Sequence, residues 1–179
     1  MSAPAIIESI NGSAVAEWMR LSVKAMPIVE ATHVLAIAVV FGTILVVDLR
    51  LLGLPGTQRP LSRVAGEMLR MTWAAFALAV VTGALMFAPN ALTYFDNTAF
   101  RLKLLALLAA GINMAVFQFI TARSMDQWDV NRRPPTAART AAIISMLLWT
   151  SVILLGRWIG FTKGYDFSVP EDIQFEFPQ

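Results

Sequence analysis

The residues of this chain best suited to chemistry are Glu30 and His33, in the stretch PIVEATHVLA at residues 27–36. His33 is the one histidine of the sequence and follows Glu30 by three residues, so both would lie on one face of a helix. An imidazole can ligate haem iron, exchange protons near neutral pH or hydrogen-bond to a ligand. Because an apolar run follows directly, we expect this pair near one end of a long helix.

Other residues could complete a site around His33 if the fold brings them to the same level in a membrane. Arginines pair with haem propionates, a thioether can be a second axial ligand, and an indole can form the wall of a quinone pocket. The candidates for cofactor binding are His33, Glu30, Arg101, Arg157, Trp158 and Met86. His33 is the candidate metal ligand, and no residue is assigned a catalytic role.

Three interpretations of this group stay open. A haem held by two histidines of one subunit is excluded, which leaves His33 with Met86, His33 with an open position, or a haem shared across a dimer axis. A quinone needs only a hydrogen-bond donor and an aromatic wall, which His33, Arg157 and Trp158 would supply. In a purely structural role, Glu30 pairs with His33 or Arg157, and the longer basic side chains extend to the lipid headgroups. The cofactor is therefore unknown, with haem b and quinone as the alternatives.

The elements that must position these residues are membrane helices. Hydrophobic residues make up 57% of the 179-residue chain and charged residues only 15%, below the roughly one quarter of soluble domains. Stretches without Asp, Glu, Lys or Arg run over 31–47, 71–95, 104–122 and 140–156. Each approaches the roughly 20 residues that cross a bilayer as a helix. We predict an all-α, integral membrane four-helix bundle over 27–162, with spans near 27–52, 70–89, 100–123 and 139–162.

The basic residues predict the orientation of the bundle. The connections 48–70 and 123–139 each contain four arginines against two acids. The positive-inside rule places both connections in the cytoplasm. Both termini then face outward, which in a Gram-negative bacterium is the periplasm. We therefore expect a multi-pass protein of the bacterial inner membrane, N-out and C-out, with the candidate site residues near its periplasmic end.

The two ends of the chain are predicted to lie outside the spans. Residues 1–26 place charged and apolar side chains at helical spacing, which predicts an amphipathic interfacial helix with an interruption at Asn11, Gly12 and Ser13. This segment lacks a basic stretch followed by an apolar run, so we expect no secretory signal peptide. Residues 163–179 are predicted to be an acidic periplasmic tail, either a docking segment for a periplasmic protein or a disordered end.

Several classes of function are excluded by composition and motif. The chain has no cysteine, so it contains no disulfide, iron–sulfur cluster or thiolate metal site of its own. A net charge of +2 is too small to indicate nucleic-acid binding. No nucleophile–base pair, P-loop or zinc-site spacing is present.

Polar residues deeper in the spans are predicted to have structural roles. Asp48 and Arg50 are expected to cap the end of the first span or to pair with the arginines that follow it. Asn113 is expected to hydrogen-bond to a neighbouring helix. Proton transfer between Asp48 and His33 is not expected, because Thr43 is the one hydroxyl between them.

Three phrases of the sequence resemble a group of small bacterial inner-membrane proteins classed as a domain of unknown function. They are VEATHVLAIAVVFGTILVVDLRLLG, FRLKLLALLAAGINMAVFQF and LLGRWIGF. The resemblance implies a four-helix integral membrane fold and a bacterial source, and it draws attention to the site candidates that lie within these phrases. It supplies no reaction.

From these observations we expect a non-catalytic accessory component, or one that binds a ligand or partner, with a polar site at the periplasmic end of the bundle. The alternative is a small membrane electron-transfer protein that binds haem b or quinone near His33. The expected partners are the lipid bilayer, a homo-oligomer or larger membrane complex, and a periplasmic protein at the C-terminal tail. No nucleic-acid partner is expected.

Overall fold

The computed structural model describes residues 4–53, 61–120 and 134–162, and in these ranges the chain forms helices and short turns without strands. The helices are α1 (Ala5–Asn11), α2 (Ala14–Leu21), α3 (Ala25–Leu51), α4 (Leu61–Phe87), the 3-10 helix η1 (Ala88–Asn90), α5 (Ala91–Asp96), α6 (Thr98–Phe119) and α7 (Thr136–Thr162). Four segments are long and apolar enough to cross a membrane, and they are Ala25–Leu51, Met68–Asp96, Thr98–Phe119 and Thr136–Thr162. The predicted all-α fold with four membrane-spanning helices is therefore confirmed.

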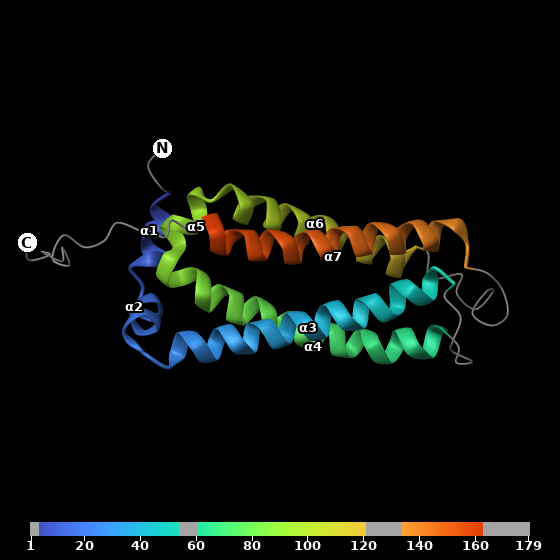
Figure 1. The fold of residues 1–179 in the computed structure, drawn as a ribbon, viewed down its shortest axis with the longest axis horizontal. Helices are drawn as coiled ribbons and strands as arrows, with labels where there is room; N and C mark the ends of the chain where they lie inside the picture. The colour runs from blue at the N-terminus through green and yellow to red at the C-terminus, as the bar shows by residue number, and fades with distance from the viewer. Residues whose placement is uncertain (1–3, 54–60, 121–133, 163–179) are drawn as a thin grey trace, which may run out of the picture.

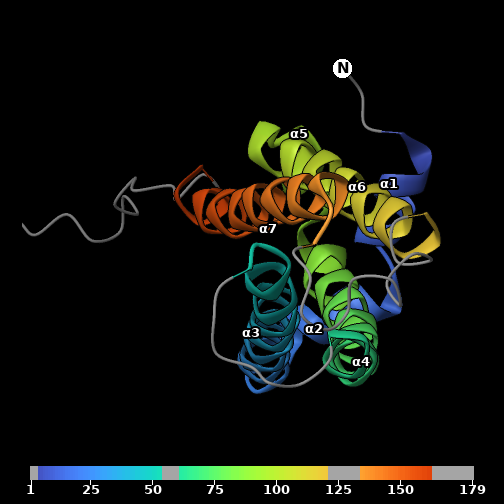
Figure 2. The same cartoon turned by 90° about the vertical axis from the view of Figure 1, so that its right-hand side faces the viewer.

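The four long helices run along one axis, with neighbours in sequence pointing in opposite directions (Figure 1). α3 packs along α4, and α6 packs along α7. Contacts between α3 and α7 join the two pairs, which are seen from the end of the bundle in Figure 2. Many large apolar side chains stay exposed along all four helices, as expected for surfaces that face lipid rather than water.

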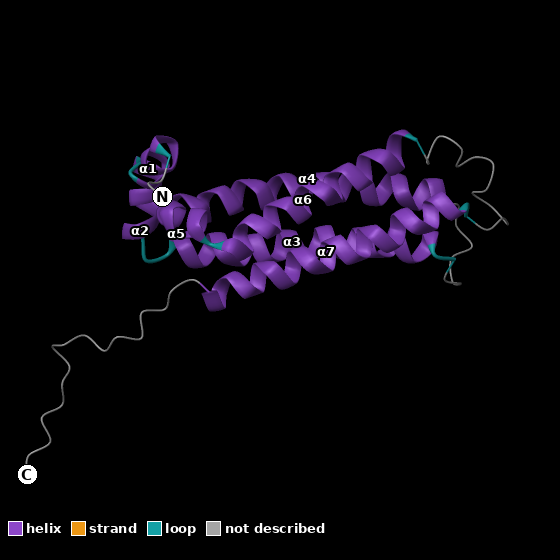
Figure 3. Ribbon diagram, turned by 90° about the horizontal axis from the view of Figure 1, so that it is seen from above, coloured by secondary structure: helices purple, strands orange, loops and turns teal. Residues whose placement is uncertain are grey.

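The short helices gather at one end of the bundle, which we call the capped end (Figures 1 and 3). It contains α1, α2, η1 and α5, together with the first turns of α3 and α6 and the last turns of α4 and α7. Contacts of α1 with α5 and of α2 with η1 fix the short helices to one another. We call the opposite end, where α3 and α6 end and α4 and α7 begin, the far end.

The N-terminal segment forms two helices with a break at Gly12 and Ser13, where the sequence predicts the interruption. The Ser13 hydroxyl caps α2 by accepting a hydrogen bond from the Ala16 amide. Arg20 then joins the segment to the bundle, because its guanidinium donates to the carbonyl of Pro89 at 3.0 Å and to that of Asn11 at 2.8 Å. The capped end is thus held by polar contacts as well as by packing.

The inward face of α3 alternates steps of three and four residues, the spacing of a helix that packs against its neighbours. Ala36, Val40, Thr43 and Leu51 are buried along this face, and His33 is half-buried at its start. Near the far end, Leu51 packs with the small residues Ala138 and Ala142 of α7. Small residues at such a contact let two membrane helices approach closely.

α4 and α7 begin earlier than the predicted spans, because polar helical turns precede their apolar parts. α4 begins at Leu61 rather than near residue 70, and α7 begins at Thr136 rather than near residue 139. Hydropathy marks the part of a helix that lipid surrounds, whereas the hydrogen-bonded helix continues into the interface. Residues 121–123 of the predicted third span and the predicted tail at 163–179 lie outside the described residues.

Candidate functional site

The central contact of the candidate site joins α3 to α4. His33 lies two turns inside α3, about 12 Å along the axis from Ala25 at 1.5 Å per residue. Its Nδ1 atom is 2.9 Å from the hydroxyl oxygen of Thr82 on α4. The side chain of Thr82 is buried and that of His33 is half-buried, so this hydrogen bond lies inside the bundle at the capped end.

The hydrogen bonds of Thr82 favour one of the two neutral tautomers of His33. A threonine has one hydroxyl proton, and Thr82 donates it to the carbonyl of Leu78 at 2.7 Å on its own helix. We therefore assign the Thr82 oxygen as the acceptor at the 2.9 Å contact and His33 Nδ1 as the donor. In the neutral ring the Nε2 atom then has a free lone pair, which can accept a proton or a hydrogen bond or bind a metal.

The imidazole of His33 lies directly against the backbone of Gly83. A Cβ atom at residue 83 would come within 3.1 Å of His33 Cε1, closer than most carbon contacts in proteins. Glycine thus leaves the space that the ring occupies. Together, Thr82 fixes one edge of the ring and Gly83 fixes its position against α4.

Lys103 of α6 brings a positive charge to the same level of the bundle. Its ammonium is close enough for its charge to act on the imidazole of His33. The lysine stem lies over Gly156 of α7, where a Cβ atom would be 3.7 Å from Nζ and 3.8 Å from Cε. Among the residues that the structure describes, no acidic side chain acts on Lys103. All four long helices therefore contribute to one polar layer, which we call the His33 site: His33, Thr82, Gly83, Lys103 and Gly156.

The other basic and acidic candidates lie outside this layer. Glu30 is exposed, and His33 bonds to Thr82 rather than to Glu30. Arg157 and Trp158 are exposed on α7, with the Arg157 guanidinium 5.3 Å from the centre of the Phe161 ring. These residues are at the level of the capped end, but they face away from the His33 site.

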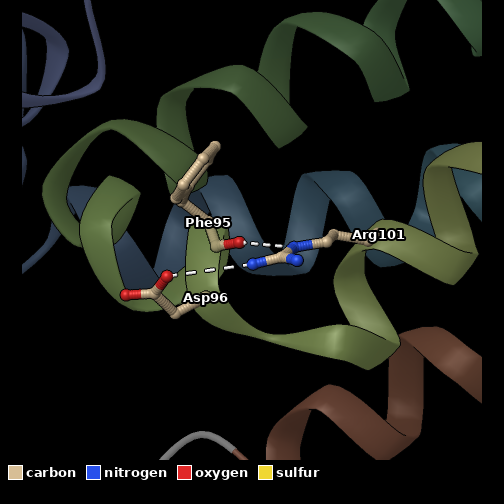
Figure 4. Close-up of polar contacts among 3 residues, drawn as sticks. All are labelled: Phe95, Asp96 and Arg101. Atoms are coloured by element: carbon tan, nitrogen blue, oxygen red, sulfur yellow. Dashed lines mark hydrogen bonds and ion pairs between the residues drawn. The ribbon is translucent and has the colours of Figure 1, made fainter. Parts of the chain in front are cut away.

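Arg101 shows the same outward placement on α6 (Figure 4). Its Nε donates to the carbonyl of Phe95 at 2.8 Å, and its guanidinium lies 3.8 Å from the carboxylate of Asp96. The guanidinium also lies over the Phe95 ring, at 5.4 Å from the centroid. Arg101 therefore holds α5 to the start of α6, while Lys103, two residues later, faces inward.

Three aromatic rings lie on the outer side of the His33 site, between it and the short helices. Phe87 at the end of α4 stacks on Phe100 of α6 at a centroid distance of 5.4 Å and on Tyr94 of α5 at 5.9 Å. Phe100 precedes Lys103 by one turn of α6. Met86 is half-buried on the same last turn of α4. The aromatic rings that lie one turn from the polar groups on α4 and α6 are thus packed together, whereas Trp158 is exposed.

Below the His33 site, α3 and α4 have an apolar section and then another polar contact. Ala36 and Val40 are buried in the apolar section. The Thr43 and Thr72 hydroxyl oxygens are then 2.7 Å apart. Thr43 lies ten residues after His33, or about 15 Å along the helix. The two polar contacts are thus separate layers.

Sequence reasoning found His33 but missed its partners. Thr82 and Gly83 stand in a charge-free stretch, and nothing in one sequence says which threonine of α4 faces α3. Arg101 and Lys103 are two residues apart and so point to opposite sides of α6, but nothing in one sequence says which of the two faces inward. In the described ranges, no group of three or more His, Cys, Asp or Glu side chains could hold a metal ion. His33 could therefore ligate a metal only within a cofactor that brings further ligands.

Comparison with known proteins gives one family. The sequence model of a family described as a family of unknown function (DUF6644) matches residues 22–162. No curated protein and no solved structure matches the chain. The match begins at the turn before α3 and ends with α7, so it covers the four long helices and the whole His33 site.

Proposed function

The chain belongs to this family of unknown function, and we propose that it is a non-catalytic component of the bacterial inner membrane that binds a quinone at the His33 site. One observation carries the proposal: an imidazole bonded through Nδ1 to Thr82 and a lysine without an acidic partner among the described residues share one layer inside the helices. Ionisable groups at membrane depth are costly and are usually kept for a ligand, an ion or a proton.

The chemistry of the two groups favours the head of a quinone. The ammonium of Lys103 can donate to a quinone oxygen, and Nε2 of His33 can accept from the hydroxyl of the reduced form. A flat ring could stack against the cluster of Phe87, Tyr94 and Phe100, which lies outward of both groups. A lipid-soluble molecule can reach such a site from the bilayer, because exposed apolar side chains cover all four long helices.

A titration tests this proposal. The purified protein in detergent would be titrated with a short-chain ubiquinone analogue, and tryptophan fluorescence would report binding. A hydrogen bond to a charged group contributes about 1.5–3 kcal/mol, so Lys103→Met should weaken binding roughly ten- to hundredfold. Arg101→Gln is the matched control, because Arg101 lies on the same helix and faces outward, and it should bind as the unchanged protein does. Failure of the unchanged protein to bind, or equal binding by Lys103→Met, would refute the proposal.

A second function is favoured by the tautomer of His33. The free Nε2 is the atom that a haem iron takes, so a b-type haem for electron transfer is the competing proposal. Met86 is on the neighbouring turn of α4 and is the candidate for a second ligand. An absorption spectrum of the purified protein, oxidised and then reduced, separates the two. A Soret band that is lost in His33→Ala supports haem, and a colourless preparation from haem-sufficient cells supports quinone.

The proposal also includes an orientation, with the capped end in the periplasm. It is supported by the four arginines in each of the segments 48–70 and 123–139, which connect α3 to α4 and α6 to α7 in the sequence. Reporter fusions test it: alkaline phosphatase joined after residue 162 should be active, and a fusion within 123–139 should be inactive. The reverse pattern would move the His33 site to the cytoplasmic side.

A further inference from the structure

A second ionisable group lies buried near the far end of the bundle. Asp48 of α3 is only 5% exposed. Ser145 of α7 hydrogen-bonds to its carboxyl group, and the serine hydroxyl is the donor. The other oxygen, Oδ2, is buried and has no hydrogen-bond partner in the described part of the chain. Asp48 therefore does not cap the end of α3, which was one of the two roles predicted for it from the sequence.

An apolar cluster lies one turn from Asp48 along α3. Leu51, one turn further along α3, packs with Ala138 and Ala142 of α7, and Val47 and Phe117 pack against that group. A carboxylate charge buried in such surroundings costs several kcal/mol unless a cation or several donors compensate it. The single hydrogen bond from Ser145 is not sufficient compensation.

Among the side chains that the structure describes, the charged groups on the helices packed around Asp48 do not act on its carboxyl group. On α3 itself, Arg50 is half-buried and has an interaction of its own. Arg70 of α4 and Arg139 of α7 are exposed. Among the described residues, the polar group that reaches Asp48 is Ser145, which is neutral.

A bound metal ion fits this site poorly. A hard cation takes about six oxygen ligands, and the described residues offer the carboxyl group of Asp48 and the hydroxyl of Ser145. The nearest further hydroxyls on α3 and α4, those of Thr43 and Thr72, bond to each other. A water molecule could reach Oδ2 but would leave the negative charge in place. A proton, in contrast, removes the charge and needs no further ligand.

We propose that Asp48 is a proton-binding site, which holds a proton on its carboxyl group at neutral pH while α3 and α7 are packed together. Release of the proton would leave a carboxylate among Leu51, Ala138 and Ala142, so it requires water to enter between the two helices. The proton and the close α3–α7 contact are therefore coupled. This site does not depend on what the His33 site binds.

Infrared spectroscopy of the whole protein in lipid vesicles tests the proposal directly. A protonated carboxylic acid has a C=O stretching band well separated from that of a carboxylate. We expect this band at neutral pH in the unchanged protein, its shift on isotope labelling of aspartate, and its loss in Asp48→Asn. Asp96→Asn is the matched control, because Asp96 is exposed beside Arg101, and it should keep the band. A spectrum without the band at neutral pH, or a band that persists in Asp48→Asn, would overturn the proposal.

Two further measurements keep the test decisive if Asp48→Asn does not fold. Ser145→Ala removes the hydrogen bond to the carboxyl group and should raise the frequency of the same band, whereas a band from any other acid would not move. The folded protein should also lose stability as pH rises, because unfolding would release a proton to the solvent. A free energy of unfolding that is the same at pH values below and above neutrality would contradict a proton bound to Asp48.

Discussion

Replacing Thr82 by valine removes the hydroxyl that accepts from His33 while keeping the shape of the side chain. The 2.9 Å contact between Nδ1 and the hydroxyl oxygen lies inside the bundle. Interhelical hydrogen bonds in membrane proteins average about 0.6 kcal/mol and reach about 1.7 kcal/mol. Because Thr82 is buried, we expect a coupling near the upper part of this range, about 1–1.5 kcal/mol. The proton of His33 can move to Nε2 in the variant, which limits the loss.

A double-mutant cycle measures this coupling. The four proteins are the unchanged chain, Thr82→Val, His33→Leu and the combination, and each is unfolded with SDS in mixed micelles while tryptophan fluorescence is followed. Thr32→Val is the matched control, because the Thr32 hydroxyl donates to Ile28 of its own helix at 2.8 Å. That change should cost less than about 0.5 kcal/mol. If the effects of the two central changes add within about 0.3 kcal/mol, His33 and Thr82 are not coupled and the assignment of the tautomer fails.

Three further predictions concern single contacts. Nitrogen-15 NMR of histidine-labelled protein gives one pair of ring signals, because His33 is the one histidine. The signals should show the neutral ring protonated at Nδ1, and protonation at Nε2 would contradict the assigned hydrogen bond from His33 to Thr82. Asn113→Leu removes the 3.0 Å hydrogen bond to the Ala141 carbonyl and should destabilise the α6–α7 pair by about 0.6 kcal/mol in the same SDS titration, whereas an unchanged midpoint would deny that bond a role. Arg20→Met removes the bond to Pro89 and should speed amide hydrogen exchange in α1 and α2 but not in α7. If α1 and α2 exchanged as slowly in the variant as in the unchanged protein, Arg20 would not hold the N-terminal segment to the bundle.

The sequence predicted the membrane helices well, because hydropathy and charge are local properties. Charge-free stretches identify the spans directly, and the Asn11–Gly12–Ser13 interruption is a local breaker signal. A hydrogen bond from Asn113 to a neighbouring helix was also predicted, and it is confirmed, because a buried amide in a span has few other partners. Its partner, the Ala141 carbonyl, could not be named in advance.

The sequence was less informative about the site, because the face that each helix turns inward depends on the helices packed against it. The hydropathy of α3 and α6 is similar on all sides, so no apolar stripe marks their inward faces. That is why the sequence did not show which of Arg101 and Lys103 faces inward. The glycines show the same limit: Gly83 faces His33 closely, whereas a Cβ at Gly42 or Gly111 would meet no other atom within 4 Å.

The apolar section between the two polar layers of α3 has an electrical consequence. Ala36 and Val40 fill the interior over about 15 Å between His33 and Thr43, without a polar group of α3 to hold water. This section acts as an insulator, so most of a transmembrane voltage would fall across it. His33 and Lys103 would then remain at the potential of one aqueous side and Asp48 at that of the other. Each site would respond to the pH of its own compartment, and moving a charge between them would cost about 2.3 kcal/mol per 100 mV.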